Sequence, residues 1–242
     1  MKKIFGAVAM FVCATAFAST NSGFGLSVVV GDAPRPEYCA RGTTYIEAIR
    51  GASYGIRITN PTPYRVAVAL SIDGLNTIDA KHTDPRNGSK WVLGPYESTV
   101  IPGWQVNGQT ARSFYFTGER NSYGAALGQT ENLGVIEAVF YRERHREISV
   151  YAPRAEQNSA KAAPSAAAPP SEDYAATGMG NRTDHEVETV DIDLENRPAA
   201  SIRLRYEFRP QLVRLGVLPR VSAPIERRER ARGFESYCPE VH

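Results

Sequence analysis

Alternation of apolar and polar residues is the strongest pattern in the chain. From Tyr64 to Ile72 the larger apolar side chains stand at every second position. A period of two is typical of a β-strand with one buried face. We therefore expect a central strand whose inward side chains are Tyr64, Val66, Val68, Leu70 and Ile72. Asp73-Gly74 follows directly and predicts a tight hairpin turn, because glycine adopts positive φ without steric cost.

Shorter runs of the same kind lie on both sides of this strand, at 26–30, 54–59, 112–117 and 136–140. Proline and glycine punctuate the sequence between them, and no amphipathic helix is apparent beyond one expected turn at 123–127. Short strands at this spacing predict an all-β fold, an antiparallel β-sandwich formed by residues 24–151.

The composition changes after Tyr151. Residues 152–182 are rich in Ala, Pro and Ser, and we expect a flexible linker there because the stretch offers little apolar surface to bury. Residues 183–219 contain two alternating runs, 190–194 and 202–208, which predict a β-hairpin packing back on the sandwich. Its acidic and basic outer faces would then lie side by side. Residues 220–242 form a charged tail.

The first eighteen residues have the pattern of an export signal. Lys2 and Lys3 precede an apolar run, and Ala16-Phe17-Ala18 provides a cleavage site. The run is shorter than the roughly 20 residues of a membrane-spanning helix. We expect a periplasmic or secreted protein, cleaved after Ala18, with no integral membrane segment in the mature chain.

Charge and cysteine content narrow the classes of partner. Without Lys2 and Lys3 the 28 basic residues become 26, equal to the 26 acidic ones. This balance argues against nucleic-acid binding through bulk charge.

Cleavage would remove Cys13 and leave Cys39 and Cys238, for which a disulfide is the preferred interpretation and two unpaired thiols the alternative.

Three patterns suggest chemistry, and each has a simpler explanation. Gly51 to Gly55 matches the G-x-S-x-G elbow of hydrolases around Ser53, but a strand follows where that motif needs a helix. The His82/Asp84 and Asp184-His185-Glu186 groups match no established zinc spacing. Asp73, Asn76 and Asp79 offer oxygen ligands for calcium, although capping of the turn by Asp73 and Asn76 explains them better. We expect no catalytic residue, metal ion or cofactor.

Aromatic side chains are the remaining candidates for a binding surface. Several occupy strand positions that would face outward, where they could contact a protein or stack on sugar rings. The predicted binding residues are Asp73, Asn76, Trp91, Trp104 and Tyr123; the wider aromatic set adds Tyr96, Tyr115, Tyr141 and Tyr151. The loops 73–90 and 103–109 are the expected location of a functional surface.

Several segments between Tyr45 and Glu143 carry a resemblance to a known group of proteins. They are VAVALSIDGLNTIDAK, KWVLGPYESTVIPGWQV, RSFYFT, SYGAALG and NLGVIEAVFYRE. In order and spacing they resemble an uncharacterised family of bacterial exported β-rich proteins with S-[VI]-D-G-x-N, I-x-G-W and L-G-V-I patterns. This resemblance implies a shared domain and carries no catalytic residue.

The leading functional hypothesis is therefore an exported, non-enzymatic module that binds protein or cell-envelope material, as a structural or assembly component. A carbohydrate-binding protein is the alternative, and a hydrolase is a more distant one.

Overall fold

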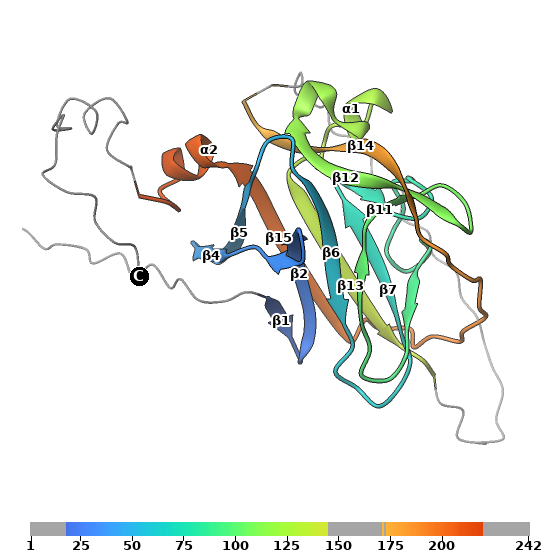
Figure 1. Ribbon diagram of the computed structural model, residues 1–242. Helices are drawn as coiled ribbons and strands as arrows, with labels where there is room; N and C mark the ends of the chain where they lie inside the picture. The colour runs from blue at the N-terminus through green and yellow to red at the C-terminus, as the bar shows by residue number, and fades with distance from the viewer. Residues whose placement is uncertain (1–17, 145–170, 172, 220–242) are drawn as a thin grey trace, which may run out of the picture.

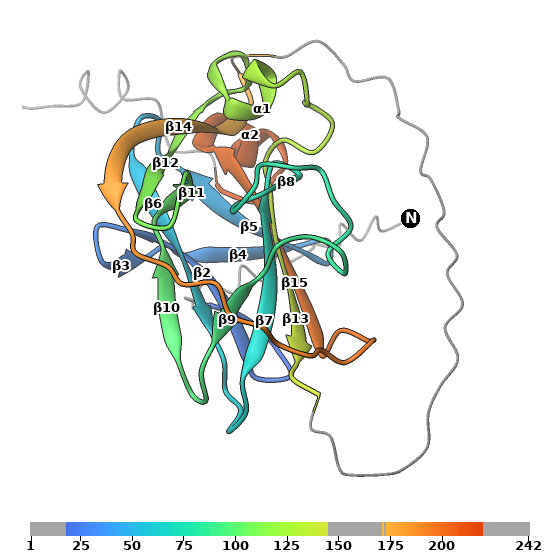
Figure 2. The ribbon, with the colours of Figure 1, turned by 90° about the vertical axis from the view of Figure 1, so that its right-hand side faces the viewer.

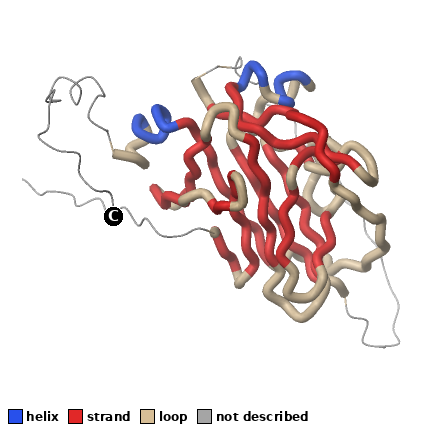
Figure 3. The backbone as a smooth tube through the Cα atoms, in the orientation of Figure 1, coloured by secondary structure: helices blue, strands red, loops and turns tan. Residues whose placement is uncertain are grey.

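The computed structural model describes residues 18–144, 171 and 173–219, which form two β-sheets packed face to face (Figure 1). Strands dominate this part of the chain, and the helical segments are short (Figure 3). They are η1 (Glu119–Asn121), α1 (Tyr123–Ala126) and α2 (Arg209–Arg214). The predicted all-β sandwich is confirmed, and α1 provides the helical turn expected near Tyr123.

The first sheet is antiparallel, with the order β1-β2-β6-β12-β11. In addition β10 pairs with β6, β14 with β12, and β3 with β2. Its strands are β1 (Ser19–Asn21), β2 (Phe24–Val30), β3 (Ala33–Pro34), β6 (Ser53–Thr59), β10 (Ser98–Ile101), β11 (Gly103–Gln105), β12 (Thr110–Gly118) and β14 (Ala175–Asp184).

The second sheet has the order β4-β5-β15-β13-β7-β8, with β9 paired to β7. Its pairs are antiparallel except for β15 beside β5, which run parallel. Its strands are β4 (Glu37–Ala40), β5 (Thr43–Ala48), β7 (Val66–Ile72), β8 (Leu75–Asn76), β9 (Trp91–Leu93), β13 (Val135–Arg142) and β15 (Ala200–Phe208).

The core lies between the two sheets, and β7 contributes to it as its alternation predicts. Val66, Val68, Leu70 and Ile72 are at most 1 % exposed. Tyr64 does not belong to this set: it precedes the strand, in the loop after Pro63, and is 47 % exposed. Its predicted inward position is therefore wrong.

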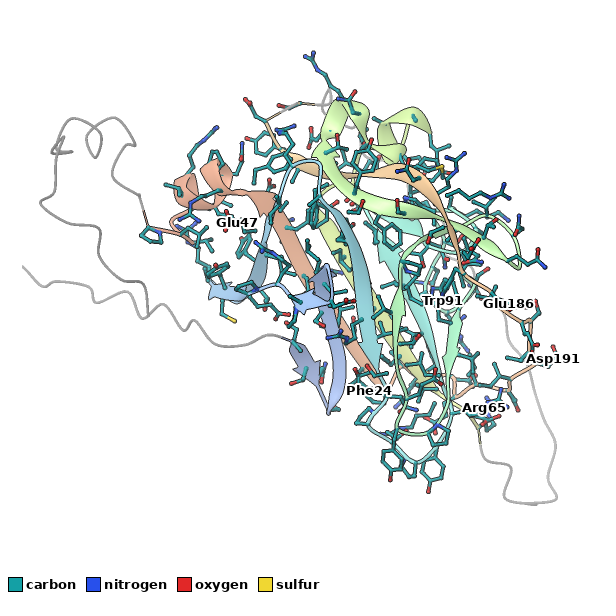
Figure 4. All side chains as sticks on the ribbon, viewed as in Figure 1. Phe24, Glu47, Arg65, Trp91, Glu186 and Asp191 are labelled. Carbon is teal, nitrogen blue, oxygen red and sulfur yellow. The ribbon has the colours of Figure 1, made fainter. Side chains whose placement is uncertain are left out.

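The predicted C-terminal hairpin is wrong in its pairing. The 202–208 alternation does form β15, but β15 lies between β13 and β5. Residues 190–194 contribute only an isolated bridge between Leu194 and Glu143. The segment 185–199 runs along the outside of the sandwich, with Glu186 and Asp191 pointing away from it (Figure 4). Ion pairing changes accordingly, since Arg203 pairs with Glu137 and Asp193 with Arg144.

The predicted linker extends too far. Its last residues belong to β14, which starts at Ala175 and pairs with β12 along most of its length. The sequence of β14 does not indicate a strand because it contains glycines, which strands rarely favour. A Cβ on Gly178 would lie 2.3 Å from ring carbons of Tyr115, so only glycine lets the ring lie against the backbone.

Several predicted features lie outside the described residues: the export signal to residue 17, most of the linker, Tyr151, and the charged tail with Cys238. Within the described ranges, no helix has both the length and the apolar character needed to cross a membrane.

Candidate functional site

A groove runs across the outer face of the second sheet and has a volume of about 1040 Å³. It crosses β5, β15, β13 and β7. One wall is the loop after β8, which projects outward beside β7 (Figure 2), and the opposite wall is the turn between β4 and β5. Its lining includes Ser71, His82, Glu137, Arg203 and Arg205.

The groove is hollow because small side chains lie on its floor. Ala69 and Ser71 face outward from β7, opposite the inward residues of the core, and they leave space beside the longer side chains of β13 and β15. Leu194 packs against the cluster that Ala69 of β7 forms with Val139 and Tyr141 of β13. The strand alternation therefore produces a polar, recessed outer face.

Hydrogen bonds within the loop 76–90 hold that wall in place. The Asn76 side chain accepts from the Ile78 backbone N–H at 2.9 Å and donates to the Ser89 carbonyl at 2.8 Å. Asp79 accepts from the Lys81 N–H and from the Ser89 hydroxyl. Asn76 thus caps the start of this loop and not the Asp73-Gly74 turn as predicted, and the Asn76 and Asp79 oxygens proposed for calcium accept hydrogen bonds within the loop.

The floor of the groove carries one paired and one unpaired arginine. The Arg203 guanidinium donates to the Glu137 carboxylate at 3.0 and 3.2 Å. Arg205, one step further along β15, forms neither a hydrogen bond nor a salt bridge with any residue that the structure describes. The exposed Arg205 guanidinium can therefore receive a carboxylate or carbonyl from outside.

His82 stands at the rim of the groove. Its Nδ1 lies 3.0 Å from the Gly74 carbonyl oxygen. Because a carbonyl only accepts, Nδ1 must carry the proton in this contact, which leaves Nε2 as an acceptor in the neutral ring. His82 therefore adds a polar contact to the groove.

Asp73 lies elsewhere, and its carboxylate is buried inside the sandwich. The predicted turn is confirmed, since Asp73 and Gly74 have φ of +55° and +77°. The carboxylate does not cap that turn, however. Its oxygens accept from the Gly134 and Thr177 backbone N–H groups and from the Tyr206 hydroxyl, at 2.8, 2.7 and 2.5 Å. The expectation that Asp73 caps its own turn or binds a ligand on the surface is wrong, because the side chain joins β14, β15 and the start of β13.

A chain of hydroxyls continues from Asp73 across the core. Thr177 Oγ1 lies 2.6 Å from Tyr206 Oη and 2.7 Å from Tyr54 Oη. An ionised carboxylate only accepts, so each hydroxyl donates toward it: Tyr54 to Thr177, Thr177 to Tyr206, and Tyr206 to Asp73. Burial raises the pKa of Asp73 to about 7, against the lowering effect of these donors. All four residues of this cluster are buried, and Asp73 is 3 % exposed. The cluster therefore links strands inside the fold and offers no surface to a ligand.

The predicted aromatic binding residues pack within the molecule. Trp104 is 2 % exposed, meets Phe114 edge to face, and contacts the half-buried Tyr123. Trp91 donates to the Thr77 hydroxyl, and the imidazole of His185 lies 5.5 Å from its ring. Trp91, Trp104 and Tyr123 therefore do not line the groove, whereas Asn76 does.

Members of the wider aromatic set are dispersed. Tyr141 is 4 % exposed, and Tyr115 lies against Gly178. Tyr96 is 68 % exposed and lies in the turn between β9 and β10. The described aromatic residues do not share one exposed platform.

The residues considered for catalysis, metal binding and a disulfide do not come together in one site. Ser53 begins β6 and makes no hydrogen bond to a histidine among the described residues. No group of three or more potential metal ligands is found in the described part of the chain. Cys39 is exposed, with its Sγ 3.8 Å from Thr44 Oγ1. Its pairing with Cys238 stays a prediction.

The sequence contains one signal for the groove, the outward-facing arginines of β15. Arg203 and Arg205 alternate with the buried residues of β15, which placed them on an outer face opposite Asp191 and Asp193. The structure instead places β13 and β5 beside them. Comparison with known proteins adds no identification, since no family model, curated protein or solved structure matches the chain.

Proposed function

We propose that the protein is an exported, non-catalytic β-sandwich module that binds a protein of the cell envelope, and that its groove receives an extended segment of this partner. The observation that supports the proposal is the open groove itself, of about 1040 Å³, whose floor combines small side chains with the unpaired Arg205. A volume of this size is at the upper end of ligand-binding clefts.

The dimensions of the groove suit a polypeptide. It crosses four neighbouring strands, which at about 4.8 Å between strands spans about 14 Å. An extended chain rises about 3.3 Å per residue, so about four residues fit across the floor. Arg205 would pair with a carboxylate or carbonyl of that segment, and Ser71 leaves room for one of its side chains.

Filling the groove tests the proposal. Tagged wild-type protein and a Ser71→Trp variant would be used to recover partners from the envelope of the producing cells. A recovered protein would then be purified and its affinity for both forms measured. We expect Ser71→Trp to weaken binding at least tenfold, and Arg205→Ala to weaken it less. Ser53→Trp, on the first sheet, is the matched control and should bind as wild type does.

Two results would contradict the proposal. One is a purified partner that binds Ser71→Trp and wild type equally well, since the groove would then play no part. The other is retention on a glycan array by the wild type but not by Ser71→Trp, which would favour the carbohydrate-binding alternative.

A further inference from the structure

Two loops meet at the end of the sandwich opposite α1 (Figures 1 and 2). They are residues 60–64, between β6 and β7, and residues 94–97, between β9 and β10; together we call them the tyrosine tip. The Tyr96 N–H donates to the Thr62 carbonyl at 3.0 Å, and the Asn60 N–H donates to the Glu97 carbonyl at 2.8 Å. The two loops therefore form a single unit.

Asn60 fixes the shape of this unit. Its side chain is fully buried and makes four hydrogen bonds. Oδ1 accepts from the Thr62 N–H and hydroxyl at 3.0 and 2.7 Å, while Nδ2 donates to the Tyr64 and Gly94 carbonyls, each at 2.7 Å. A buried asparagine with this many partners holds both loops in one conformation.

Tyr96 occupies a backbone position that suits glycine. Residues 94–97 form a turn closed by a 3.3 Å bond from the Glu97 N–H to the Gly94 carbonyl, with Pro95 second and Tyr96 third. Tyr96 has φ of +55°. This is the type II arrangement, whose third residue is usually glycine or asparagine because a bulky side chain is strained there. The Tyr96 side chain is also 68 % exposed, so packing does not compensate for the strain.

The tip presents apolar surface and little charge. Tyr64 is 47 % exposed, and Pro63 and Pro95 lie beside the two rings in sequence and are exposed. The Thr62 hydroxyl is used inside the loop, and the Glu97 carboxylate accepts from the Gly94 N–H at 2.6 Å. Neither loop contains a lysine or arginine. What remains available is the face and hydroxyl of Tyr96 on a rigid support.

We propose that the tyrosine tip is a second interaction surface, separate from the groove, and that Tyr96 inserts into an apolar pocket on a protein partner. Rigid, exposed tyrosines are typical anchors of protein interfaces, because they bury a large area at a small cost in conformational entropy. An anionic membrane would instead call for basic residues at the tip, and a sugar for several free polar groups.

Photo-crosslinking in the producing cells identifies the partner. The full chain would carry p-benzoylphenylalanine at position 96, or at Tyr174 as the matched control. Tyr174 is 45 % exposed and precedes β14, outside the tip. We expect one protein adduct that is specific to position 96. That protein would then be purified and its affinity measured for wild type, Tyr96→Gly and Tyr174→Gly.

Tyr96→Gly separates binding from folding. Glycine relieves the positive φ, so the unfolding midpoint should stay the same or rise, while affinity falls at least tenfold. Tyr174→Gly should keep wild-type affinity, and Ser71→Trp should bind this partner normally, which makes the result independent of the groove. The inference is overturned if the adducts at positions 96 and 174 are the same, if the adduct is a lipid or glycan, or if Tyr96→Gly binds as wild type does.

Discussion

The buried Asp73 predicts that the protein loses stability as the pH rises toward neutral. Its ordinary pKa is 3.8, and burial raises the pKa to about 7 in the folded state. Between these two values the folded protein holds a proton that the unfolded chain has released. Linkage then requires the free energy of unfolding to decrease from about pH 4 to about pH 7 and to level off above that.

The difference between the folded and unfolded pKa of Asp73 sets the size of this effect. Raising the pKa from 3.8 to about 7 corresponds to about 4 kcal/mol. A protonated Asp73, however, must donate to Tyr206, which reverses the direction of every hydroxyl in the chain. Tyr54 then has no acceptor among the described residues, at a cost of about 1–3 kcal/mol. A folded-state pKa of about 7 already includes any such cost, so the contribution of Asp73 over this pH range is about 4 kcal/mol.

Urea denaturation between pH 4.5 and pH 8.5 measures the effect. Other carboxylates titrate in this range, including Glu207, whose pKa burial raises to about 7. The informative quantity is therefore the difference between wild type and Asp73→Asn. Asparagine has nearly the same shape and no proton to release in this range, so the variant should lack about 3–4 kcal/mol of the decrease seen in wild type. Burial and the neighbouring Asp73 hold the pKa of Tyr54 and Tyr206 well above the usual value for tyrosine, so neither titrates here.

Tyr54→Phe tests the direction of the hydroxyl chain. At pH 8 it should cost about 1 kcal/mol, the value of the bond to Thr177. Near pH 4.5 the substitution should cost nothing, because in the protonated state the Tyr54 hydroxyl has no acceptor and its removal loses no hydrogen bond. The stability of Tyr54→Phe should therefore decrease more steeply with pH than that of wild type. Parallel curves for wild type, Asp73→Asn and Tyr54→Phe would refute the reasoning, as would a wild-type stability that increases relative to Asp73→Asn on going from pH 4.5 to pH 7.

Three further predictions concern the fold. Gly178→Ala should destabilise the protein by about 1–3 kcal/mol in urea, because the new Cβ would overlap the Tyr115 ring; Gly108→Ala, with its nearest contact at 3.6 Å, should be within about 1 kcal/mol of wild type. Asn60→Ala should cost about 2–4 kcal/mol, since it removes a buried side chain that makes four hydrogen bonds; Asn107→Ala, in an exposed loop, should cost less. Thiol titration of the denatured mature protein should find no free thiol if Cys39 and Cys238 are paired, and two free thiols would exclude the disulfide.

The sequence was sufficient for the fold class because the core of a sandwich has a local signature. Each central strand buries every second residue, so β7 and β15 could be recognised from their own residues. The alternation within a strand does not show which other strands it pairs with. Proximity in sequence predicts that β15 pairs with the run 190–194, whereas it pairs with β13 and β5, which lie far away in sequence. Alternation identifies the faces of a strand and leaves its neighbours undetermined.

The strand β14 was missed for a different reason. Its sequence, AATGMGNRTD, contains few of the β-branched and aromatic residues that favour strands. The glycines are required by its partner β12, whose Tyr115 ring and Ser113 occupy the space where side chains of Gly178 and Gly180 would lie. The propensity of this segment is thus overridden by a contact with residues about sixty positions earlier.

The candidate surfaces were predictable to the extent that they depend on local chemistry. The turn chemistry of Asp73-Gly74 is local and could be inferred. The buried position of the Asp73 carboxylate was not, because its donors at Gly134, Thr177 and Tyr206 lie 61, 104 and 133 residues away. Those long-range bonds also decide where a ligand can be bound. They withdraw the Asp73 carboxylate from the surface, so the interaction surfaces proposed for this sandwich, the groove and the tyrosine tip, depend on other residues.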